Sequence, residues 1–307
     1  MAGGFQAGTG QVSSSRMLRS QVATTRTKPP TVRLRRLAAE LRRLRGESGF
    51  SREHVEEQTG VNEGTLYRLE TARARPQKRT LLALLDLYSV SDPLRSDLLD
   101  LARSAGDQGW ARPYHWQLPG EYAAYISFEA EARAVHNYES LFIPGLLQTE
   151  EYSRAMIKGA LPTATQAETD ERVKARVERQ ELLEGGEALE LWAVVDEAAI
   201  RRVVGGRQVM AAQLLQVIEM VQRPNITLQV VTFETGAHSG MPGPFVHMEF
   251  RSELDPELIY VDTLAGDIFL EADDDVRRYR QMFDHLRAGA LSPDQSAKLI
   301  SSVAEKL

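Results

Sequence analysis

The chain has 307 residues, of which 26% are charged and 42% hydrophobic. This composition is typical of globular proteins and excludes a disordered or collagen-like chain. The absence of cysteine excludes disulfide scaffolds, thiol nucleophiles and cysteine-based metal sites. The net charge of -6 hides an asymmetry, because residues 1–105 hold 18 basic and 11 acidic side chains, whereas residues 106–307 hold 19 and 32. A basic first part and an acidic second part predict a nucleic-acid-binding module joined to another domain.

Residues 1–31 are rich in Gly, Ser, Thr and Ala, and no acidic residue precedes Glu40. We interpret them as a disordered basic tail; an organelle transit peptide and a basic arm lying along DNA phosphates are the alternatives. Met17 is a plausible internal start, so residues 1–16 need not be native. No apolar run approaches the roughly 18 residues that span a bilayer, and no secretory signal is visible. We therefore expect a cytoplasmic, nucleoid-associated protein without a membrane partner.

Residues 32–105 have the pattern of five short helices. Apolar residues in the first helix follow helical spacing, from Leu34 to Leu44. Ser51 can cap a second helix that ends at Gly60, and Asn62 can cap a third that extends to about Ala72. Leucine-rich fourth and fifth helices follow. The second and third helices, joined by a tight turn at Gly60, predict a helix-turn-helix whose third helix, about residues 62–72, enters the DNA major groove.

Residues 41–90 resemble the XRE/Cro-repressor type of helix-turn-helix. The match includes Leu41, Leu44, Arg45, Gly49, Ser51, Gly60, Val61, Arg68, Glu70, Pro76, Leu81, Leu84 and Tyr88. Two positions depart from the family pattern: Glu56 replaces a small residue where the two helices touch, and Ala72 replaces the glycine after the recognition helix. The resemblance implies a five-helix, XRE-like DNA-binding domain that reads a palindromic operator as a homodimer.

The predicted contacts to double-stranded DNA are made by residues around the recognition helix: Arg52, Asn62, Glu63, Gly64, Thr65, Tyr67, Arg68 and Arg73. Alternatives remain for several of them. Arg68 could form an internal ion pair with Glu70, and Tyr67 could be half-buried packing. Glu63 could accept a hydrogen bond from a cytosine amino group, although a carboxylate also repels phosphates.

Residues 106–307 predict an α+β domain with a small sheet of about four strands. We expect a linker with Trp110, Tyr114 and Trp116, and then a long helix from Tyr122 to about Ser140. The other predicted helices span 150–157, 165–183, 197–203, 210–221, 273–286 and 293–303. The predicted strands span 188–195, 226–233, 245–250 and 258–261. The aromatic residues of the first blocks form either core or a groove for a partner: Trp110, Trp116, Tyr122, Tyr125, Tyr138 and Phe142.

This second part also resembles a family. Blocks such as Pro144-Gly145-Leu146-Leu147-Gln148-Thr149-Glu150 and Val195-Asp196-Glu197-Ala198 are similar to the C-terminal domain of actinobacterial XRE regulators of the WhiJ-like and antitoxin-like kind. The resemblance implies a transcription regulator and a possible small protein partner. It implies no established chemistry for the domain, which could dimerise, sense a small-molecule effector or dock a partner.

Motifs for catalysis or cofactors are weak. Gly236 to Gly240 holds His238 where a hydrolase motif needs serine. The six histidines lack His-x-x-x-His spacing; His238 and His247 could meet across a hairpin, but a loop and a strand surface are the expected positions. We predict no enzyme activity, no cofactor and no metal. The main hypothesis is a sequence-specific DNA-binding regulator, and the alternative is an antitoxin-like module that binds a small partner protein and regulates its own expression.

Overall fold

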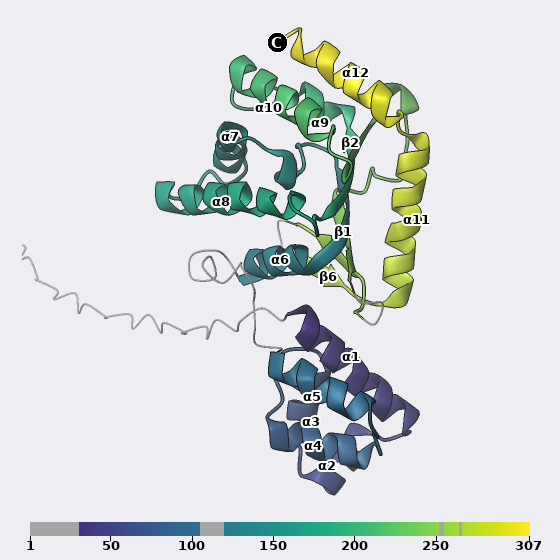
Figure 1. Cartoon of the computed structure of the whole chain (residues 1–307). Coiled ribbons are helices and arrows are strands. Elements are labelled where there is room, and N and C mark those ends of the chain that lie inside the picture. The colour runs from purple at the N-terminus through teal and green to yellow at the C-terminus, as the bar shows by residue number, and fades with distance from the viewer. Residues whose placement is uncertain (1–30, 105–119, 252–254, 264–265) are drawn as a thin grey trace, which may run out of the picture.

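The computed structural model describes residues 31–104, 120–251, 255–263 and 266–307. Within these residues the chain forms a helical domain followed by an α+β domain (Figure 1). The expected N-terminal tail and the linker aromatics Trp110, Tyr114 and Trp116 lie outside the described residues.

Five helices make up the first domain: α1 (Val32–Glu47), α2 (Arg52–Thr59), α3 (Glu63–Glu70), α4 (Lys78–Leu87) and α5 (Leu94–Ser104). They confirm the five predicted helices, although the recognition helix ends two residues earlier than expected. Each helix contributes apolar side chains to one core, which includes Leu41, Val55, Leu66 and Leu84. The spacing of these leucines along the sequence therefore identified the buried faces correctly.

The second domain contains a mixed sheet of six strands: β1 (Ala132–Glu139), β2 (Glu190–Asp196), β3 (Ile226–Val231), β4 (Phe245–Phe250), β5 (Leu258–Val261) and β6 (Ile268–Leu270). The strand order is β3-β2-β1-β4-β5-β6. β1, β2 and β3 are parallel, whereas β4, β5 and β6 each run antiparallel to the preceding strand in that order. β1 and β4 occupy the middle of the sheet.

Helices cover both faces of the sheet (Figure 1). The helices of this domain are α6 (Gly120–Glu131), α7 (Glu150–Ala160), α8 (Gln166–Arg179), α9 (Glu197–Arg201), α10 (Arg207–Met220), α11 (Asp273–Gly289) and α12 (Pro293–Ala304). Of the described helices, α11 is the one on the first face, and its Phe283 and Leu286 pack with Tyr138 and Phe245 of the sheet. The other helices enclose the larger core on the opposite face.

Two predictions for this domain are wrong in detail. The helix expected from Tyr122 to about Ser140 ends at Glu131, and residues 132–139 form β1. The sheet also has six strands instead of about four. β1 is covered on both faces, so its burial does not alternate regularly, and its apolar residues happen to fit helical spacing as well.

Four of the aromatic residues considered as core or groove lie in or against the cores of this domain. Tyr125 and Tyr138 are buried in the cores on opposite faces of the sheet, whereas Tyr122 and Phe142 are partly buried at the edge of the larger core. Tyr125 also donates a hydrogen bond from its hydroxyl to Glu129, whose carboxylate is bound by the buried Arg179. These residues therefore have a structural role as packing and as partners of a buried ion pair.

The first turn of α1 joins the two domains. Val32 is buried in the larger core of the α+β domain. The side chain of Arg35 is 1% exposed; its Nε donates to Glu271 Oε1 at 2.7 Å, and its guanidinium lies 4.8 Å from the ring centroid of Phe128. Arg36 Nη1 lies 3.6 Å from Asp255 Oδ1. The helix-turn-helix is therefore held against the other domain by a buried contact at one end of α1.

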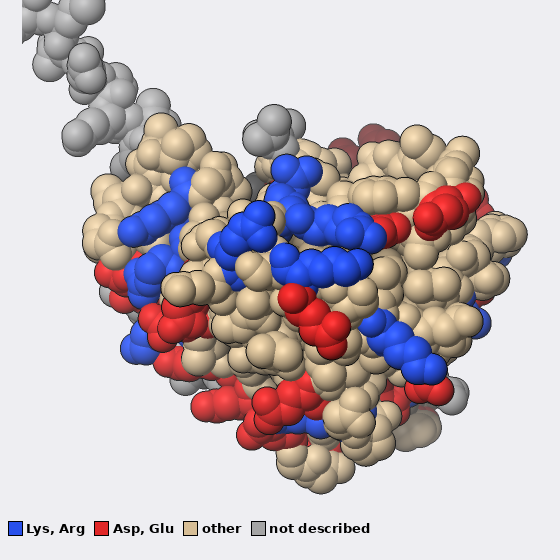
Figure 2. All heavy atoms as spheres, turned by 90° about the horizontal axis from the view of Figure 1, so that it is seen from above, with Lys and Arg blue, Asp and Glu red and all other residues tan. Residues whose placement is uncertain are grey.

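The surface of the acidic domain is not uniformly acidic. Figure 2 views the molecule from above, at the end distant from α1–α5, and shows lysine and arginine side chains gathered on that face, with acidic side chains beside and below them. None of the helices in the described part of the chain combines the length and apolar character that a membrane-spanning segment needs.

Candidate nucleic-acid interface

The turn between α2 and α3 is built from capping residues. Ser51 begins α2, and its side chain accepts a hydrogen bond from His54 N. Gly60 ends that helix with φ of +71°, a left-handed conformation that favours glycine. Asn62 then caps α3, with its Oδ1 2.8 Å from Thr65 N. These three residues confirm the capping predictions and allow the chain to reverse direction within a few residues.

One face of α3 is buried and the opposite face is open to solvent. Leu66 and Leu69 are buried in the helical core. Asn62, Glu63, Gly64, Tyr67 and Arg68 are exposed, as expected for a helix that presents one face to a ligand. Thr65 is partly exposed, and Arg73, which follows the helix, is exposed. These residues are therefore open to a ligand on one side of α3, and their contact with DNA stays a prediction.

Glu70 forms the buried polar centre of the three helices. Its side chain is 0% exposed, and its carboxylate accepts hydrogen bonds from Arg45 Nε at 2.5 Å and from Arg52 Nε at 2.9 Å. Arg45 and Arg52 each add a second bond, at 3.2 and 2.8 Å. The hydrogen bond to Glu70 raises the pKa of Arg45. This carboxylate links α1, α2 and α3 through charge-assisted hydrogen bonds.

Arg68 is not a partner of Glu70, so the internal pair considered for these two residues does not form. Its Nη2 instead donates to Thr65 Oγ1 at 3.0 Å, one turn earlier on the exposed face of α3. Arg52, in contrast, is held by Glu70. The guanidinium of Arg68 therefore remains on the outward surface, whereas that of Arg52 is fixed at its edge.

Two of the predicted contact residues, Arg52 and Arg73, lie against the ring of Tyr67. Tyr67 as a whole residue is 41% exposed. The guanidinium carbons of Arg52 and Arg73 lie 5.4 and 5.5 Å from its centroid, within the range of cation–π attraction. The structure therefore brings Arg52, Tyr67 and Arg73 together beside the outer face of α3.

Comparisons with known families divide the chain at the same place as the structure. A family model described as "Domain of unknown function (DUF5753)" matches residues 122–302, which run from α6 to α12. The chain belongs to the DUF5753 family. A second model, described as "Helix-turn-helix domain", matches residues 36–98, which run from α1 to α5. Searches of curated proteins and of solved structures found no match.

In this DUF5753 protein, the two departures from the expected helix-turn-helix pattern are each accommodated. Glu56 lies outward, and its Oε2 accepts a hydrogen bond from Glu63 N at 2.9 Å, so the carboxylate satisfies a free donor at the start of α3. Ala72 adopts φ of +53°. The backbone at this position is therefore left-handed, which is the conformation that favours the glycine of the family pattern. Ala72 adopts it at a cost in backbone strain.

The sequence did not reveal a second polar region of the DUF5753 domain. Residues of β4, the loop before β5, and α11 line a cleft of about 920 Å³. Its lining includes Asp255 and Glu271, which pair with arginines of α1, and Glu249 and Glu257, which pair with histidines.

His247, which was expected on a strand surface, is only 2% exposed. It lies beside His136, while His238 is 3.4 Å from Asp196. No local motif connects these distant positions.

Proposed function

We propose that this protein is a sequence-specific DNA-binding transcription regulator that places α3 in the major groove. The helix-turn-helix match indicates a DNA-binding regulator, and the observation that carries the finer proposal is the outward face of α3. Arg68 is exposed there, and its side chain donates a hydrogen bond to Thr65, one turn earlier on the same helix. An arginine in this position can bind the O6 and N7 atoms of guanine with two hydrogen bonds. We propose that Arg52, Tyr67 and Arg73, which lie together beside the outer face of α3, contact the phosphates that flank the groove.

The charge distribution supports the same proposal. The excess of basic side chains lies in residues 1–105, and an arginine-rich binding surface releases counterions from DNA. The affinity should therefore fall steeply with salt. We propose that the protein acts in the cytoplasm, on double-stranded DNA, by binding and not by catalysis.

We further propose that the regulator is a homodimer and that the DUF5753 domain senses an effector or docks a small partner. Dimeric helix-turn-helix proteins read two half-sites about 34–36 Å apart, so the two recognition helices need a fixed separation. The contact between α1 and the DUF5753 domain, through Val32 and Arg35, supports this proposal because it limits how the recognition helix can move. The cleft beside that contact supports a sensing role, since Glu271 both lines the cleft and binds Arg35.

Selection of duplexes from a random pool, followed by measurement of affinity, tests the proposed function. The full chain should bind the selected duplex at least about 10³-fold more tightly than a scrambled duplex at the same salt concentration. A selected sequence with two-fold symmetry would support the dimer. Equal affinity for the selected and scrambled duplexes, or an affinity independent of salt, would contradict the proposal.

A further inference from the structure

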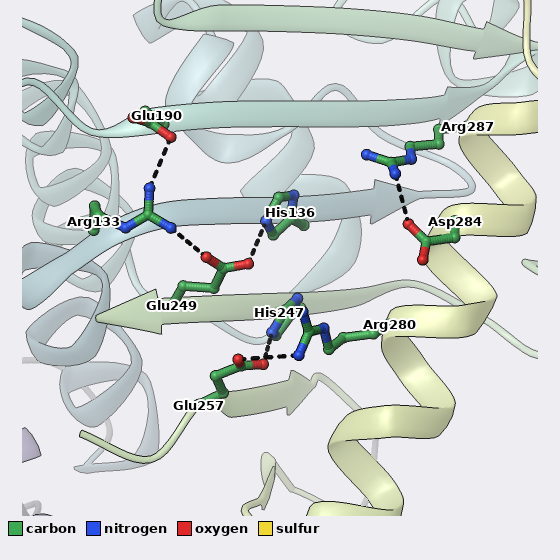
Figure 3. Close-up of polar contacts among 9 residues, drawn as sticks. All are labelled: Arg133, His136, Glu190, His247, Glu249, Glu257, Arg280, Asp284 and Arg287. Atoms are coloured by element: carbon green, nitrogen blue, oxygen red, sulfur yellow. Dashed lines mark hydrogen bonds and ion pairs between the residues drawn. The ribbon is translucent and has the colours of Figure 1, made fainter. Parts of the chain in front are cut away.

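A cluster of histidines and carboxylates lies on the face of the sheet beneath α11. His136 of β1 and His247 of β4 are directly opposite each other in the antiparallel register. Glu249 follows on the same face of β4, and Glu257 immediately precedes β5 (Figure 3). Tyr138, Phe245 and Phe283 continue this face as an aromatic cluster. Hydrophobic packing does not require imidazoles and carboxylates at this position, so we asked what they could bind.

The distances within the cluster suit a small cation. His136 Nε2 lies 3.0 Å from Glu249 Oε1, and the two imidazole centroids are 5.2 Å apart. One ligand atom from each of His136, His247 and Glu249 lies within 4.8 Å of the other two. In a tetrahedral zinc site, bonds of about 2.0–2.2 Å place the ligand atoms roughly 3.3–3.6 Å apart. Side-chain rotations that move these atoms by about 1 Å would therefore bring all three into bonding range.

The surroundings of the three residues orient them. His247 has a side chain that is 3% exposed, and its Nε2 lies 2.7 Å from Glu257 Oε2 (Figure 3). A histidine that donates one ring N–H to a carboxylate presents its other nitrogen as a ligand, an arrangement common around protein-bound metals. Arg133 binds the second oxygen of Glu249, which leaves Oε1 facing His136.

The second ring nitrogen of His136 is also compatible with a bound ion. Nδ1 of His136 is buried without a hydrogen-bond partner among the described residues. It can take the ring proton through a change of tautomer, which frees the lone pair of Nε2 for the ion.

We propose that His136, His247 and Glu249 bind a divalent transition-metal ion of the zinc class, with Glu257 as the partner that orients His247. Two imidazoles and one carboxylate form a ligand set that zinc accepts, and three protein ligands leave a fourth position for water. The ion can reach this site because Glu249 and Glu257 line the cleft of about 920 Å³ beside α11. This inference does not depend on DNA binding.

Titration of the tag-free, EDTA-treated full chain with Zn²⁺ by calorimetry, and with Co²⁺ by visible absorption, tests the proposal. We expect one ion per chain and the visible bands of tetrahedral Co²⁺. Glu249→Gln keeps the size of a side chain that is 22% exposed and should weaken Zn²⁺ binding at least about 100-fold. Glu257→Gln should weaken it about 10–100-fold, as is usual for a residue that orients a ligand. His285→Ala is the matched control, because His285 is an exposed histidine on α11.

Each outcome decides the proposal. The expected order is wild type and His285→Ala alike, Glu257→Gln weaker, and Glu249→Gln weakest, with the far-ultraviolet circular dichroism of all four proteins unchanged. The absence of stoichiometric Zn²⁺ binding to the wild-type protein at micromolar concentrations would overturn the proposal without reference to any variant. Binding that persists unchanged in Glu249→Gln, or that disappears in His285→Ala, would place the ion elsewhere and would equally overturn it.

Discussion

Replacement of Glu70 by glutamine should destabilise the helix-turn-helix domain. The carboxylate is 0% exposed and accepts four hydrogen bonds, two from Arg45 and two from Arg52. Glutamine keeps the shape but replaces one acceptor oxygen with an NH₂ donor, which then faces a guanidinium. Removal of one partner from a buried ion pair costs about 3–5 kcal/mol.

The lower end of that range applies here. The side chains of Arg45 and Arg52 are 18% and 35% exposed, so water can solvate part of the charge that Glu70→Gln leaves unpaired. We therefore expect a loss of about 3 kcal/mol. A domain of this size has a total stability of only about 4–11 kcal/mol, at 0.05–0.15 kcal/mol per residue. The variant should thus open far more often, although it should still fold.

Amide hydrogen exchange is the appropriate assay, because it resolves the opening of α1–α3 from that of the DUF5753 domain. A loss of about 3 kcal/mol corresponds to exchange roughly 100-fold faster in α1 and α3. Amides of the sheet should not change. Glu57→Gln is the control, since the Glu57 side chain is 66% exposed and should change exchange by less than about 3-fold. An equally small change in Glu70→Gln would refute the role assigned to the buried carboxylate.

Three further predictions concern backbone conformation, pH and packing. Ser89 is exposed and has a left-handed φ of +54°. Ser89→Gly should relieve about 1–2 kcal/mol of strain, but glycine also has greater freedom in the unfolded chain. Denaturant titration should therefore show a variant that is about 0.5–1 kcal/mol more stable. Burial raises the pKa of Glu131 to about 7, so the folded state holds this proton more tightly than the unfolded chain does, and stability should fall as the pH rises from about 4.5 to 7. Glu131→Gln should flatten that part of a stability–pH curve, and an unchanged slope would contradict the assignment. A methyl group on Gly240 would overlap the buried ring of Tyr138, so Gly240→Ala should cost at least about 1–3 kcal/mol in equilibrium unfolding; wild-type stability would show that the loop moves freely.

The elements that the sequence predicted well are those with local signals. Ser51, Gly60 and Asn62 act within a few residues of their own positions, and the structure confirms all three. β4 and β5 were predicted to the residue, because turn residues bound short apolar runs. β1 was missed because it follows α6 directly, and because a central strand covered on both faces lacks a regular polar alternation.

In the candidate sites too, residues with local sequence signals could be predicted and long-range contacts could not. The outward face of α3 follows from helical spacing, so its residues could be predicted. The partners of Glu70 could not be predicted, because Arg45 and Arg52 reach it only after α1, α2 and α3 have packed together. The histidine cluster had no sequence signal, since His136 and Glu249 are separated by 113 positions and meet only through the pairing of β1 with β4.

The charge asymmetry between the two parts of the chain follows the division into two domains. The basic part contains α1–α5, and the acidic part contains the DUF5753 domain. Figure 2 nevertheless shows a group of basic side chains on the acidic domain. Net charge alone therefore does not locate a DNA-binding surface; the surface proposed for this protein rests on helix packing and on the side chains that α3 leaves exposed.

Base-resolved specificity of Arg68→Ala tests most directly the claim that the outer face of α3 reads DNA. The affinity of the wild-type protein and of the variant would be measured for the selected operator and for every single-base substitution of it, at one salt concentration. Arg223→Ala serves as the control, because Arg223 belongs to the DUF5753 domain and its side chain is 40% exposed. We predict that Arg68→Ala loses about 1–3 kcal/mol of binding free energy on the operator and no longer discriminates at one guanine of each half-site. Unchanged affinity and unchanged discrimination at every position would contradict this prediction.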